Sequence, residues 1–398
     1  MLTVEDALAR LLEGIRPTES DRVPLAESHG RAPADGTISA GMDVPPFPNS
    51  AMDGFAVRSA DGRTERSIIG ESRAGGPPAP AVALGNAVRI MTGAPVPPGA
   101  DAVVPIEEAT ERETGVSFTT DPVTGAHVRP AGLDVKRGQT IDLDPVPITS
   151  STVGLLAAMG CAQIAVHRRP RVAILSTGDE LRDVGATLGP GQIFDANAPA
   201  LAAAVLEAGG EPVVIERAPD DRDLIEARIR AAVPDADLLV ASGGVSVGAH
   251  DHVRTVIEQL GTLEFWRIAV QPGKPLAFGR IGDVPVVGLP GNPVSALVTF
   301  ELFVRPMIRA MLGLAGDGRL RVSARVDEAI GKDPARRAYL RVRVDGRHDD
   351  YRAISAGGQG SSQLLPLASA NALLLVPEGH ASTEAGARYD AILIGSPA

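Results

Sequence analysis

The sequence predicts a multi-domain protein of the α/β plus β class. A central parallel α/β sandwich domain is expected between β-rich N-terminal modules and a small C-terminal β-barrel-like domain. The chain has 398 residues, too many for one ordinary domain. Between residues 169 and 314, apolar runs of strand length alternate with helical runs, as in a parallel sheet covered on both faces. Residues 33–147 and 315–398 instead contain short apolar pieces broken by glycine and proline, which favours β modules.

The same patterns predict the order of elements along the chain. Residues 3–15 have a helical stripe of apolar side chains with Thr3 as N-cap, and residues 149–166 predict a helix followed by a strand. In the α/β domain, strands and helices then alternate until a hairpin and one long closing helix. Its segments are RVAILST, NAPALAAAVLEAGG, EPVVIERA, DRDLIEARIRAAV, DLLVAS, HVRTVIEQLG, LEFWRIAV, PLAFGRIGDVPVVGLPG and NPVSALVTFELFVRPMIRAML.

Composition restricts the partners and the compartment. The formal net charge of −11 argues against nucleic acid or a membrane surface as partner, because both require a basic face. Cys161 is the single cysteine, which excludes an intrachain disulfide and favours a reducing compartment. Residues 1–15 are acidic and amphipathic, unlike a signal peptide, and no apolar run approaches the ~18 residues of a membrane span. We therefore expect a soluble, cytoplasmic protein.

Three loops at the predicted carboxyl edge of the sheet are rich in small and polar residues. They are residues 176–181, 242–251 and 288–295. Open α/β sheets bind ligands beyond this edge. Glycine lets backbone N–H groups turn toward a ligand, and a helix that begins after the loop adds a positive dipole end. One such loop is ordinary turn chemistry, whereas three at one edge predict a cradle for an anion.

Acidic residues accompany these loops. Asp179, Glu180 and Asp251 follow two of the strands, and Asp220 follows a third. Carboxylates next to a bound phosphate repel it unless a cation lies between them, and Mg²⁺ is the usual ion. The alternative for each residue is a helix N-cap or a solvated charge, and Asp221, just before a helical run, is predicted to be a cap.

Several familiar motifs are missing from these loops. His250 and His252 have no nearby cysteine or third histidine, so zinc is not expected. The PGKP sequence at 272–275 lacks the P-loop spacing, and no G-x-G-x-x-G follows the first strand.

Lys274 is one of three lysines among 38 basic residues. Although this composition is itself typical of an arginine-biased genome, a lysine kept in such a chain is a candidate for chemistry that arginine cannot perform.

Eight motifs in one order resemble a known family. They are PPFPNSAMDGFAV, RIMTGAPVPPGADAVVPIE, RPAGLDV, VAILSTGDEL, GQIFDANAPAL, SGGVSVGAHD, QPGKPLAFG and GLPGNPVSAL. Together they resemble the molybdopterin molybdenumtransferases, the family of the MoeA proteins and the gephyrin E-domain. The resemblance runs from the N-terminus to about residue 312 and weakens after it, where ARRAYLRV and GGQGSSQL match loosely.

The resemblance implies a final step of molybdenum cofactor synthesis. Members of the family use adenylylated molybdopterin and molybdate, cleave the pyrophosphate bond, release AMP and leave molybdenum on the dithiolene. The implied partners are a second copy of the chain in a homodimer, the molybdopterin adenylyltransferase and apo-molybdoenzymes, without nucleic acid or membrane. The implied domains are a discontinuous linker and dimerisation domain at 1–40 and 129–168, an inserted β-rich domain at 41–128, a molybdopterin-binding type of α/β domain at 169–314, and a C-terminal domain at 315–398.

The resemblance also assigns roles to residues. Asp251 and Glu180 are expected to bind Mg²⁺. The catalytic set is Asp53, Thr92, Glu180, Asp220, Asp251 and Lys274, of which Asp53 and Thr92 are expected to act on the partner subunit's pocket. The substrate-binding set is Arg129, Asp134, Ser176, Thr177, Gly178, Asp179, Ser242, Gly243, Gly244, Ser246, Gly248, Arg267, Gln271, Pro290, Gly291, Asn292, Ser295, Arg337 and Ser361.

Two positions depart from the common pattern of the family. Gln271 and Arg267 stand where relatives often carry lysine. Glutamine can hydrogen-bond an oxyanion but brings no charge, so a cationic contact is not carried over to that position.

In the N-terminal half, PPFPNSAMDGF is either a Pro-rich linker or an ordered segment. We predict an ordered segment with Phe47, Met52 and Phe55 buried, because a linker gains nothing from these side chains in a chain with 3% aromatic residues.

Two other functions remain open at this point. A nucleotide- or pterin-binding enzyme similar to the molybdopterin adenylyltransferase would share the α/β domain but would have no use for residues 33–150. A non-catalytic scaffold, by analogy with gephyrin, would be expected to carry a long linker or an extra domain, and the sequence contains neither. The sequence does not decide between molybdate and tungstate.

Overall fold

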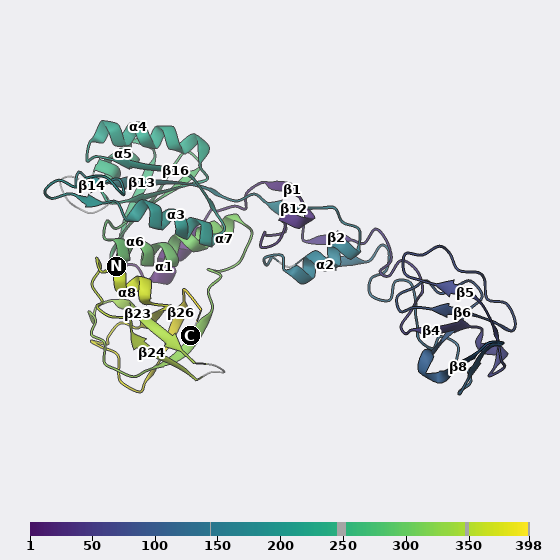
Figure 1. Ribbon diagram of the computed structural model, residues 1–398. Helices are drawn as coiled ribbons and strands as arrows, with labels where there is room; N and C mark the ends of the chain where they lie inside the picture. Colours follow the sequence, from purple (N-terminus) through teal and green to yellow (C-terminus); the bar gives the residue numbers. More distant parts are fainter. Residues whose placement is uncertain (144, 245–251, 347–349, 397–398) are drawn as a thin grey trace. The chain divides into compact units, whose positions relative to one another are not determined.

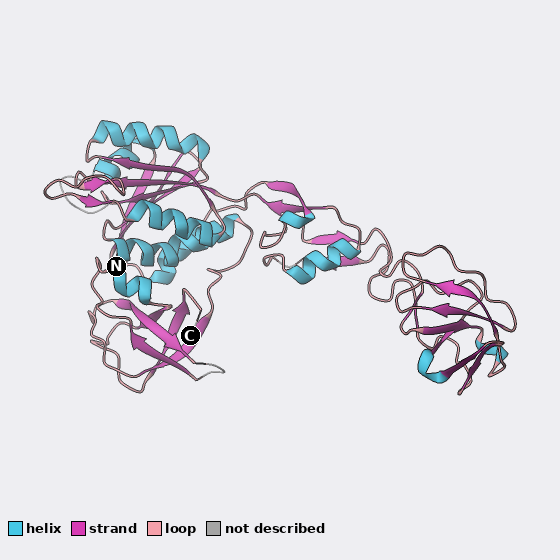
Figure 2. Cartoon of the chain, in the orientation of Figure 1, coloured by secondary structure: helices cyan, strands magenta, loops and turns pink. Residues whose placement is uncertain are grey.

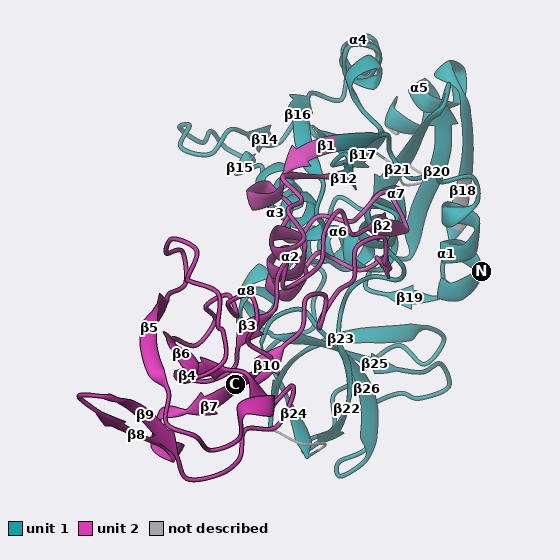
Figure 3. Cartoon of the chain, turned by 90° about the vertical axis from the view of Figure 1, so that its right-hand side faces the viewer, with its two compact units in different colours: residues 1–21, 166–398 teal, residues 22–165 magenta. Residues whose placement is uncertain are grey.

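The computed structural model describes residues 1–143, 145–244, 252–346 and 350–396. The chain forms two compact units, which are coloured separately in Figure 3. The first unit contains residues 1–21 and 166–398, and the second contains residues 22–165. Within the described ranges, no helix is both long and apolar enough to cross a membrane.

A six-stranded sheet organises the α/β part of the first unit. The order is β16 (Glu211–Ala218), β13 (Arg171–Thr177), β17 (Leu238–Ser242), β21 (Val284–Leu289), β20 (Pro275–Ile281) and β18 (Thr262–Arg267). The first four strands are parallel to one another, β20 runs antiparallel to its neighbour β21, and β18 runs antiparallel to β20 and so in the direction of the first four. The sheet is therefore mixed, because β20 and β21 form the predicted hairpin and a short connection can join only antiparallel strands.

Helices cover both faces of this sheet (Figures 1 and 2). One face carries α4 (Arg222–Ala232) and α5 (His252–Leu260), and the other carries α3 (Asn197–Ala208), α6 (Pro293–Thr299) and α7 (Arg305–Met311). Ile225 and Ile229 of α4 and Val256 of α5 are fully buried against the sheet. Each such side chain contributes about 1.5–3 kcal/mol of transfer free energy. All five residues of β17 are buried, as the continuous apolar run predicts.

The closing helix differs from the prediction of one regular helix. Its middle, Phe300–Val304, is a π-helical segment between α6 and α7. Pro306 lies at the start of α7. Since proline has no N–H and its ring clashes with the carbonyl four residues earlier, the α-helical ladder cannot run unbroken through this point.

The C-terminal part of the first unit is a closed barrel of five strands. Its strands pair in the order β23, β24, β22, β26 and β25, and β25 pairs again with β23. Closure leaves no unpaired sheet edge. The short strand β19 (Val270–Gln271) adds to the start of β23 and thereby joins the barrel to the segment before β20. The bounds are β22 (Arg321–Val326), β23 (Arg337–Asp345), β24 (Tyr351–Ser355), α8 (Leu364–Ser369), β25 (Ala372–Val376) and β26 (Arg388–Leu393).

Smaller elements complete the first unit. Helix α1 (Val4–Leu12) begins at Thr3, whose side chain accepts from the Asp6 N–H at 3.0 Å, so the predicted cap is confirmed. Asp221 accepts from the Leu224 N–H at 2.9 Å and caps α4, which is also as predicted. Two short strands, β14 (Leu181–Arg182) and β15 (Ile193–Phe194), pair in parallel beyond the end of β13.

The second unit is rich in short strands. Its largest sheet has four strands in the order β5, β6, β4 and β7, packed around Phe55, Val104 and Phe118. The bounds are β1 (Ser20–Pro24), β2 (Thr37–Ser39), β3 (Asn49–Ser50), β4 (Gly54–Val57), β5 (Ser67–Ser72), β6 (Asn86–Ile90), β7 (Ala102–Pro105), β8 (Ala109–Arg112), β9 (Gly115–Phe118), β10 (Val128–Arg129), β11 (Thr140–Asp142), α2 (Ser150–Ala158) and β12 (Gln163–His167).

One prediction for this unit is wrong in part. Phe55 is buried in β4, but Phe47 and Met52 are 42% and 38% exposed. Both exposed residues precede the strand and lie in an irregular segment, whereas Phe55 faces the core of the sheet. Gly54 is required at the start of β4, because a Cβ there would lie 2.0 Å from the Val104 carbonyl oxygen.

Candidate functional site

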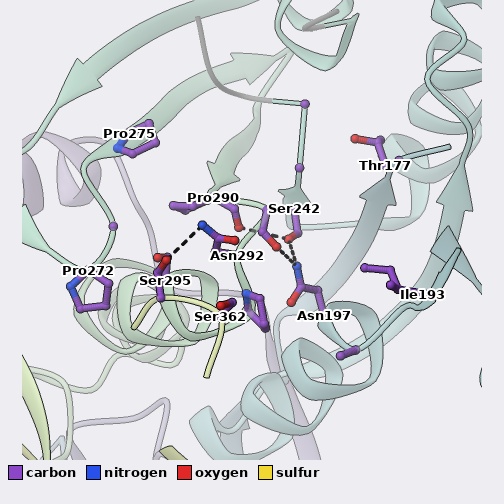
Figure 4. A pocket seen from close by; sticks show the side chains of 18 of the residues that line it. Thr177, Ile193, Asn197, Ser242, Pro272, Pro275, Pro290, Asn292, Ser295 and Ser362 are labelled. Atoms are coloured by element: carbon purple, nitrogen blue, oxygen red, sulfur yellow. Dashed lines mark hydrogen bonds between the residues drawn. The ribbon is translucent and has the colours of Figure 1, made fainter. Parts of the chain in front are cut away.

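The first unit contains a pocket of about 1060 Å³ at the carboxyl edge of its sheet (Figure 4). The three polar loops predicted from the sequence leave β13, β17 and β21, which are neighbours and parallel. Ser176 is opposite Ser242, and Ser242 is opposite Leu289, so the strands end at the same level. Parts of all three loops line the pocket, together with residues 193–197, residues 271–275 and, from the barrel, Arg336 and residues 359–362.

A hydrogen-bond network fixes the middle of the pocket. The Asn197 amide donates from Nδ2 to Ser242 Oγ and to the Gly291 carbonyl, both at 2.8 Å. Asp195 is 6% exposed, and its Oδ1 accepts from the N–H groups of Asn197 and Ala198 at 3.0 and 3.1 Å. Asp195 thus holds the first turn of α3, and Asn197 ties that turn to the ends of β17 and β21.

Glycine brings the backbone after β17 close to β13. Gly243 and Gly244 have φ values of 87° and 60°, in the left-handed region. A Cβ at Gly243 would lie 2.6 Å from the Thr177 carbonyl oxygen. The hydroxyls of Ser176 and Thr177 are buried and have no hydrogen-bond partner among the described residues, and Thr177 lines the pocket. Ser246, Gly248 and Asp251, which were predicted to continue this loop, lie outside the described residues.

Two carboxylates line the pocket beside β13 and β16. Glu180 follows β13, and Asp220 follows β16. Asp179 does not line the pocket, but its Oδ1 accepts from the Asp220 N–H at 3.0 Å and so positions that loop. Gly178 leaves room for the Glu180 carboxylate, because a Cβ there would lie 2.6 Å from Oε2. In the described part of the chain, neither the Glu180 nor the Asp220 side chain has a hydrogen-bond or ion-pair partner.

Cationic and amide groups line the pocket beside β20. Lys274 follows Gly273, where φ is 110° and a Cβ would lie 2.3 Å from Thr299 Cγ2. Glycine is therefore required there, and it directs the chain past α6 to Lys274. The Lys274 ammonium has no hydrogen-bond or ion-pair partner within the described ranges. Arg336 of the barrel also lines the pocket, and its Nε donates to Asp333 Oδ2 at 2.8 Å.

Three further hydrogen bonds join the barrel to this side of the pocket. Gln271 Oε1 accepts from the Asp333 N–H at 2.9 Å. Asn292 Nδ2 donates to Ser361 Oγ at 3.2 Å, and the Val294 N–H donates to the Ser361 carbonyl at 3.1 Å. The substitution of glutamine for lysine at 271 therefore has a structural use, since a lysine side chain cannot accept a hydrogen bond.

The order of strands separates these charges along the edge of the sheet. Asp220 and Glu180 follow β16 and β13, at one side of the order, whereas Lys274 directly precedes β20, at the other side. Between them lie the glycines and serines of the loops after β17 and β21. The pocket thus has an acidic end, a middle of hydroxyl, amide and backbone groups in which the Asp195 carboxylate is bonded to the start of α3, and a cationic end.

Several predicted residues of the first unit lie elsewhere or differ in role. Arg337 does not line the pocket, since its guanidinium pairs with Glu5 and lies 3.7 Å from Glu378. The neighbouring Arg336 lines the pocket instead, and it was missed because adjacent residues could not be told apart from sequence. Arg267 is exposed at the end of β18 and does not line the pocket.

Asn197 and Asp195 were also missed as site residues, although their motif was recognised. Both belong to GQIFDANAPAL. An Asp and an Asn just before a helical run are a signal for an N-terminal cap, and that signal marks where α3 begins. Ile193 and Phe194 of the same motif add partly exposed apolar side chains to the pocket wall.

Two of the four predicted residues of the second unit, Asp53 and Thr92, are hydrogen-bonded to each other. Asp53 Oδ1 accepts from the Thr92 N–H at 2.6 Å and from the Thr92 hydroxyl at 2.8 Å. The Thr92 backbone N–H and then its hydroxyl hold the pKa of Asp53 below its usual value, so the exposed side chain is a carboxylate at neutral pH. Arg129 lies in β10, and the Asp134 N–H donates to the Val44 carbonyl at 2.9 Å.

The fold and the pocket define a class of α/β ligand-binding protein with an appended barrel and β-rich modules. Three family models match the chain, and their boundaries correspond to these parts. A model described as the MoeA N-terminal region (domain I and II) matches residues 2–160. A model described as a probable molybdopterin binding domain matches residues 173–310, and one described as the MoeA C-terminal region (domain IV) matches residues 323–394.

Individual proteins match over their whole lengths. Molybdopterin molybdenumtransferase 2 of Mycobacterium tuberculosis is 38% identical, covering 97% of this chain and 98% of that protein. The molybdopterin molybdenumtransferase of Haemophilus influenzae is 36% identical, covering 97% of both chains. The crystal structure of a MoeA molybdopterin biosynthesis protein of Pyrococcus horikoshii superposes with a TM-score of 0.85 at 32% identity, covering 100% of both chains. The chain belongs to the MoeA family of molybdopterin molybdenumtransferases, which are transferases of molybdenum cofactor biosynthesis.

Proposed function

We propose that this enzyme transfers molybdenum from molybdate to adenylylated molybdopterin and releases AMP. The observation that carries the proposal is the division of one pocket into an acidic end, a middle of backbone donors and a cationic end. Such an arrangement suits a substrate that carries a pyrophosphate together with a second, separate oxyanion. A mononucleotide or a neutral metabolite alone would leave one of the charged ends without a use.

The middle of the pocket would hold the pyrophosphate and the pterin. The backbone N–H groups of Gly244 and of Ser295 at the start of α6 are donors suited to phosphate oxygens, whereas those of Gly243 and Val294 donate to the Leu289 and Ser361 carbonyls. The buried, unpartnered hydroxyl of Thr177 is a further donor that lines the same pocket. Ile193 and Phe194 offer apolar surface for a flat ring.

The acidic end suits Mg²⁺, which is the cation we propose. Glu180 and Asp220 supply carboxylate oxygens, the donor type that Mg²⁺ prefers, and no cation of the described residues competes for them. Asp251 is the third proposed ligand by resemblance, and it lies outside the described residues. When bound, the ion would neutralise charge on the pyrophosphate as AMP leaves. Asp179 would act indirectly by positioning the Asp220 loop.

The cationic end suits molybdate. Lys274 and Arg336 contribute two positive charges, and the hydroxyl of Ser361 and the amide of Gln271 contribute donors. With its Oε1 bonded to the Asp333 N–H, Gln271 has its Nε2 group available to an oxyanion. Molybdate and tungstate have the same shape and charge, so we assign this end to tetrahedral dianions and take molybdate as the physiological one.

We also propose that the enzyme acts as a cytoplasmic homodimer with shared sites. By resemblance, Asp53 and Thr92 of each subunit would complete the pocket of the other. The support from this chain is that Asp53 is exposed and ionised, and that its hydrogen bonds with Thr92 keep its pKa low. The molybdopterin adenylyltransferase would supply the substrate, and apo-molybdoenzymes would receive the product.

An adenylyltransferase function is the second candidate, and residues 2–160 argue against it. A MoeA-type N-terminal region matches them. An enzyme that only adenylylates molybdopterin would need neither that region nor a second oxyanion end. A single-turnover assay separates the two functions. The proposed function predicts AMP release from adenylylated molybdopterin that depends on molybdate, and AMP release equal with and without the oxyanion would rule it out.

Asp220 and Asp221 are adjacent residues that should respond differently to the same substitution. Asp220→Ala should raise the Mg²⁺ concentration needed for half-maximal AMP release by about 10-fold or more, because a metal contact is lost. Asp221→Ala should leave that concentration unchanged and cost about 0.5–2 kcal/mol of unfolding free energy, because a helix cap is lost. A Mg²⁺ titration and a denaturant titration measure the two effects. An identical Mg²⁺ response in both variants would contradict the assignment of the acidic end.

Lys274 should contribute to the binding of molybdate. We expect Lys274→Ala to raise KM for molybdate by about 10-fold to 100-fold, because a lost hydrogen bond to a charged group costs about 1.5–3 kcal/mol. Lys274→Arg should restore this only in part, since a planar guanidinium does not replace a compact ammonium. Steady-state kinetics at saturating adenylylated molybdopterin measures KM. Full recovery with arginine would mean that Lys274 acts as a general surface charge.

Shared sites predict complementation between two inactive variants. Asp53→Ala and Lys274→Ala proteins, mixed with complete subunit exchange, should form hybrid dimers in which one site carries both lesions and the other neither. At equal mixing, about a quarter of normal sites should be restored by counting under two-fold symmetry. Exchange is verified by native mass spectrometry, and activity by AMP release. Complete exchange without recovered activity would show that both residues serve the same subunit.

A further inference from the structure

Asp333 is a residue of the barrel that connects two side chains of the pocket wall. It does not line the pocket itself, and its side chain is 38% exposed. Gln271, at the end of β19, and Arg336, just before β23, both line the pocket. Asp333 Oδ2 accepts from Arg336 Nε at 2.8 Å, and the Asp333 N–H donates to Gln271 Oε1 at 2.9 Å. One residue behind the wall therefore holds both groups.

These two bonds determine which atoms are left for a ligand. A glutamine amide has an acceptor end and a donor end, and the Asp333 N–H engages the acceptor end of Gln271, so its Nε2 donor remains. The Asp333 carboxylate engages Nε of Arg336, and the two terminal nitrogens of that guanidinium have no hydrogen-bond partner among the described residues. Both side chains thus keep donor groups for a ligand in the pocket.

Asp333 is itself held in place by its neighbours in the barrel. Its Oδ1 accepts from the Ala335 N–H at 2.9 Å, which closes an Asx turn. Its carbonyl accepts from Lys332 Nζ at 3.0 Å, and the same ammonium donates to the His380 carbonyl at 2.9 Å. Lys332 is 9% exposed, and its compact ammonium on a flexible stem can join two carbonyls in so little space. Asp333 is thereby fixed to the loop between β25 and β26.

The charge of Asp333 makes its place at the cationic end of the pocket informative. The Ala335 N–H and then the Arg336 guanidinium hold the pKa of Asp333 below its usual value, so its side chain is a carboxylate at neutral pH. The field of a carboxylate repels an oxyanion and by itself weakens its binding. A benefit of Asp333 to the oxyanion must therefore come through the groups that it holds.

We propose that Asp333 is a positioning residue that orders the Gln271 amide and the Arg336 guanidinium for one oxyanion. Both side chains would otherwise lose conformational entropy when a ligand binds, and the two bonds remove part of that cost beforehand. The position of Asp333 also explains the use of glutamine where relatives often carry lysine, because a lysine could not accept from the Asp333 N–H. The inference rests on the proposed function, because it takes the ligand of this end to be a tetrahedral dianion.

Two substitutions of Asp333 separate its two contacts. Asp333→Asn keeps an oxygen that accepts from the Ala335 N–H, and so keeps the turn and the bond to Gln271, but it loses the bond to Arg336. Asp333→Ala loses the turn as well. Isothermal titration of the full-length protein with sodium molybdate should give a Kd raised about 5-fold for Asp333→Asn and about 10-fold or more for Asp333→Ala, as for coupled residues of one network.

A double-mutant cycle tests whether Asp333 acts through Arg336. In an Arg336→Met protein there is no guanidinium to position, so the further change Asp333→Asn should raise the Kd for molybdate by less than about 2-fold. An undiminished rise in that background would mean that Asp333 does not act through the guanidinium, and the inference would be wrong.

Asp317 provides a matched control in the same unit. Its Oδ1 accepts from the Arg319 N–H two residues further on, at 3.0 Å, and its Oδ2 pairs with Arg321. Neither Asp317 nor Arg321 lines the pocket. Asp317→Asn should therefore lose a similar ion pair without changing the Kd for molybdate, and thermal unfolding shows what each variant costs in stability. If it raised that Kd as much as Asp333→Asn does, a general loss of stability would explain both effects.

The sign of the change decides between position and charge. A Kd for Asp333→Asn equal to or below that of the parent protein would overturn the inference and leave the proposed function intact, because the loss of a negative charge alone predicts tighter binding. Equal rises for the asparagine and alanine variants would overturn the part assigned to Gln271. If Asp333→Asn does not fold, Asp333→Ser decides in the same way, since its hydroxyl can also accept within the turn. Failure of the parent protein to bind molybdate would overturn the proposed oxyanion end itself.

Discussion

The parallel pairing of β13, β17 and β21 is the constraint on which the site depends. Ser176, Ser242 and Leu289 lie level with one another across these strands, so three loops distant in sequence leave the sheet together. The pairing is stable because both faces of the sheet are covered and β17 is buried along its whole length. A shift in register would separate the loops, and Asn197 could then no longer bond both Ser242 and Gly291.

The strand order gives the pocket its polarity. The carboxylates of Glu180 and Asp220 belong to β13 and β16, and Lys274 belongs to the segment before β20, so opposite charges are kept apart by the width of two strands. The barrel adds Arg336 to the cationic end and is held there by β19 and by the bond from the Asp333 N–H to Gln271. A pocket built this way can bind a cation and two anionic groups, because Glu180 and Asp220 are too far along the edge to pair with Lys274, although Arg336 is bonded to Asp333.

The sequence predicted those strands, helix caps and loops that depend on local residue patterns. The strands of the α/β domain, the caps at Thr3 and Asp221 and the loops at the sheet edge follow from apolar periodicity and capping chemistry. It could not choose between Arg336 and Arg337, because the sequence does not show that β23 begins at Arg337, which pairs with Val270 of β19, and that Arg336 lies in the bend before it. Likewise, the exposure of Phe47 and Met52 depends on which residues the sheet of the second unit covers.

The central claim is that the pocket separates a metal-binding end from an oxyanion-binding end. The most direct test is an anomalous difference map, recorded at the molybdenum absorption edge, from crystals of the full-length protein grown with Mg²⁺ and molybdate. The account predicts a molybdenum peak within contact distance of Lys274 and Arg336. A peak beside Glu180 and Asp220, or molybdenum bound outside this pocket, would contradict it.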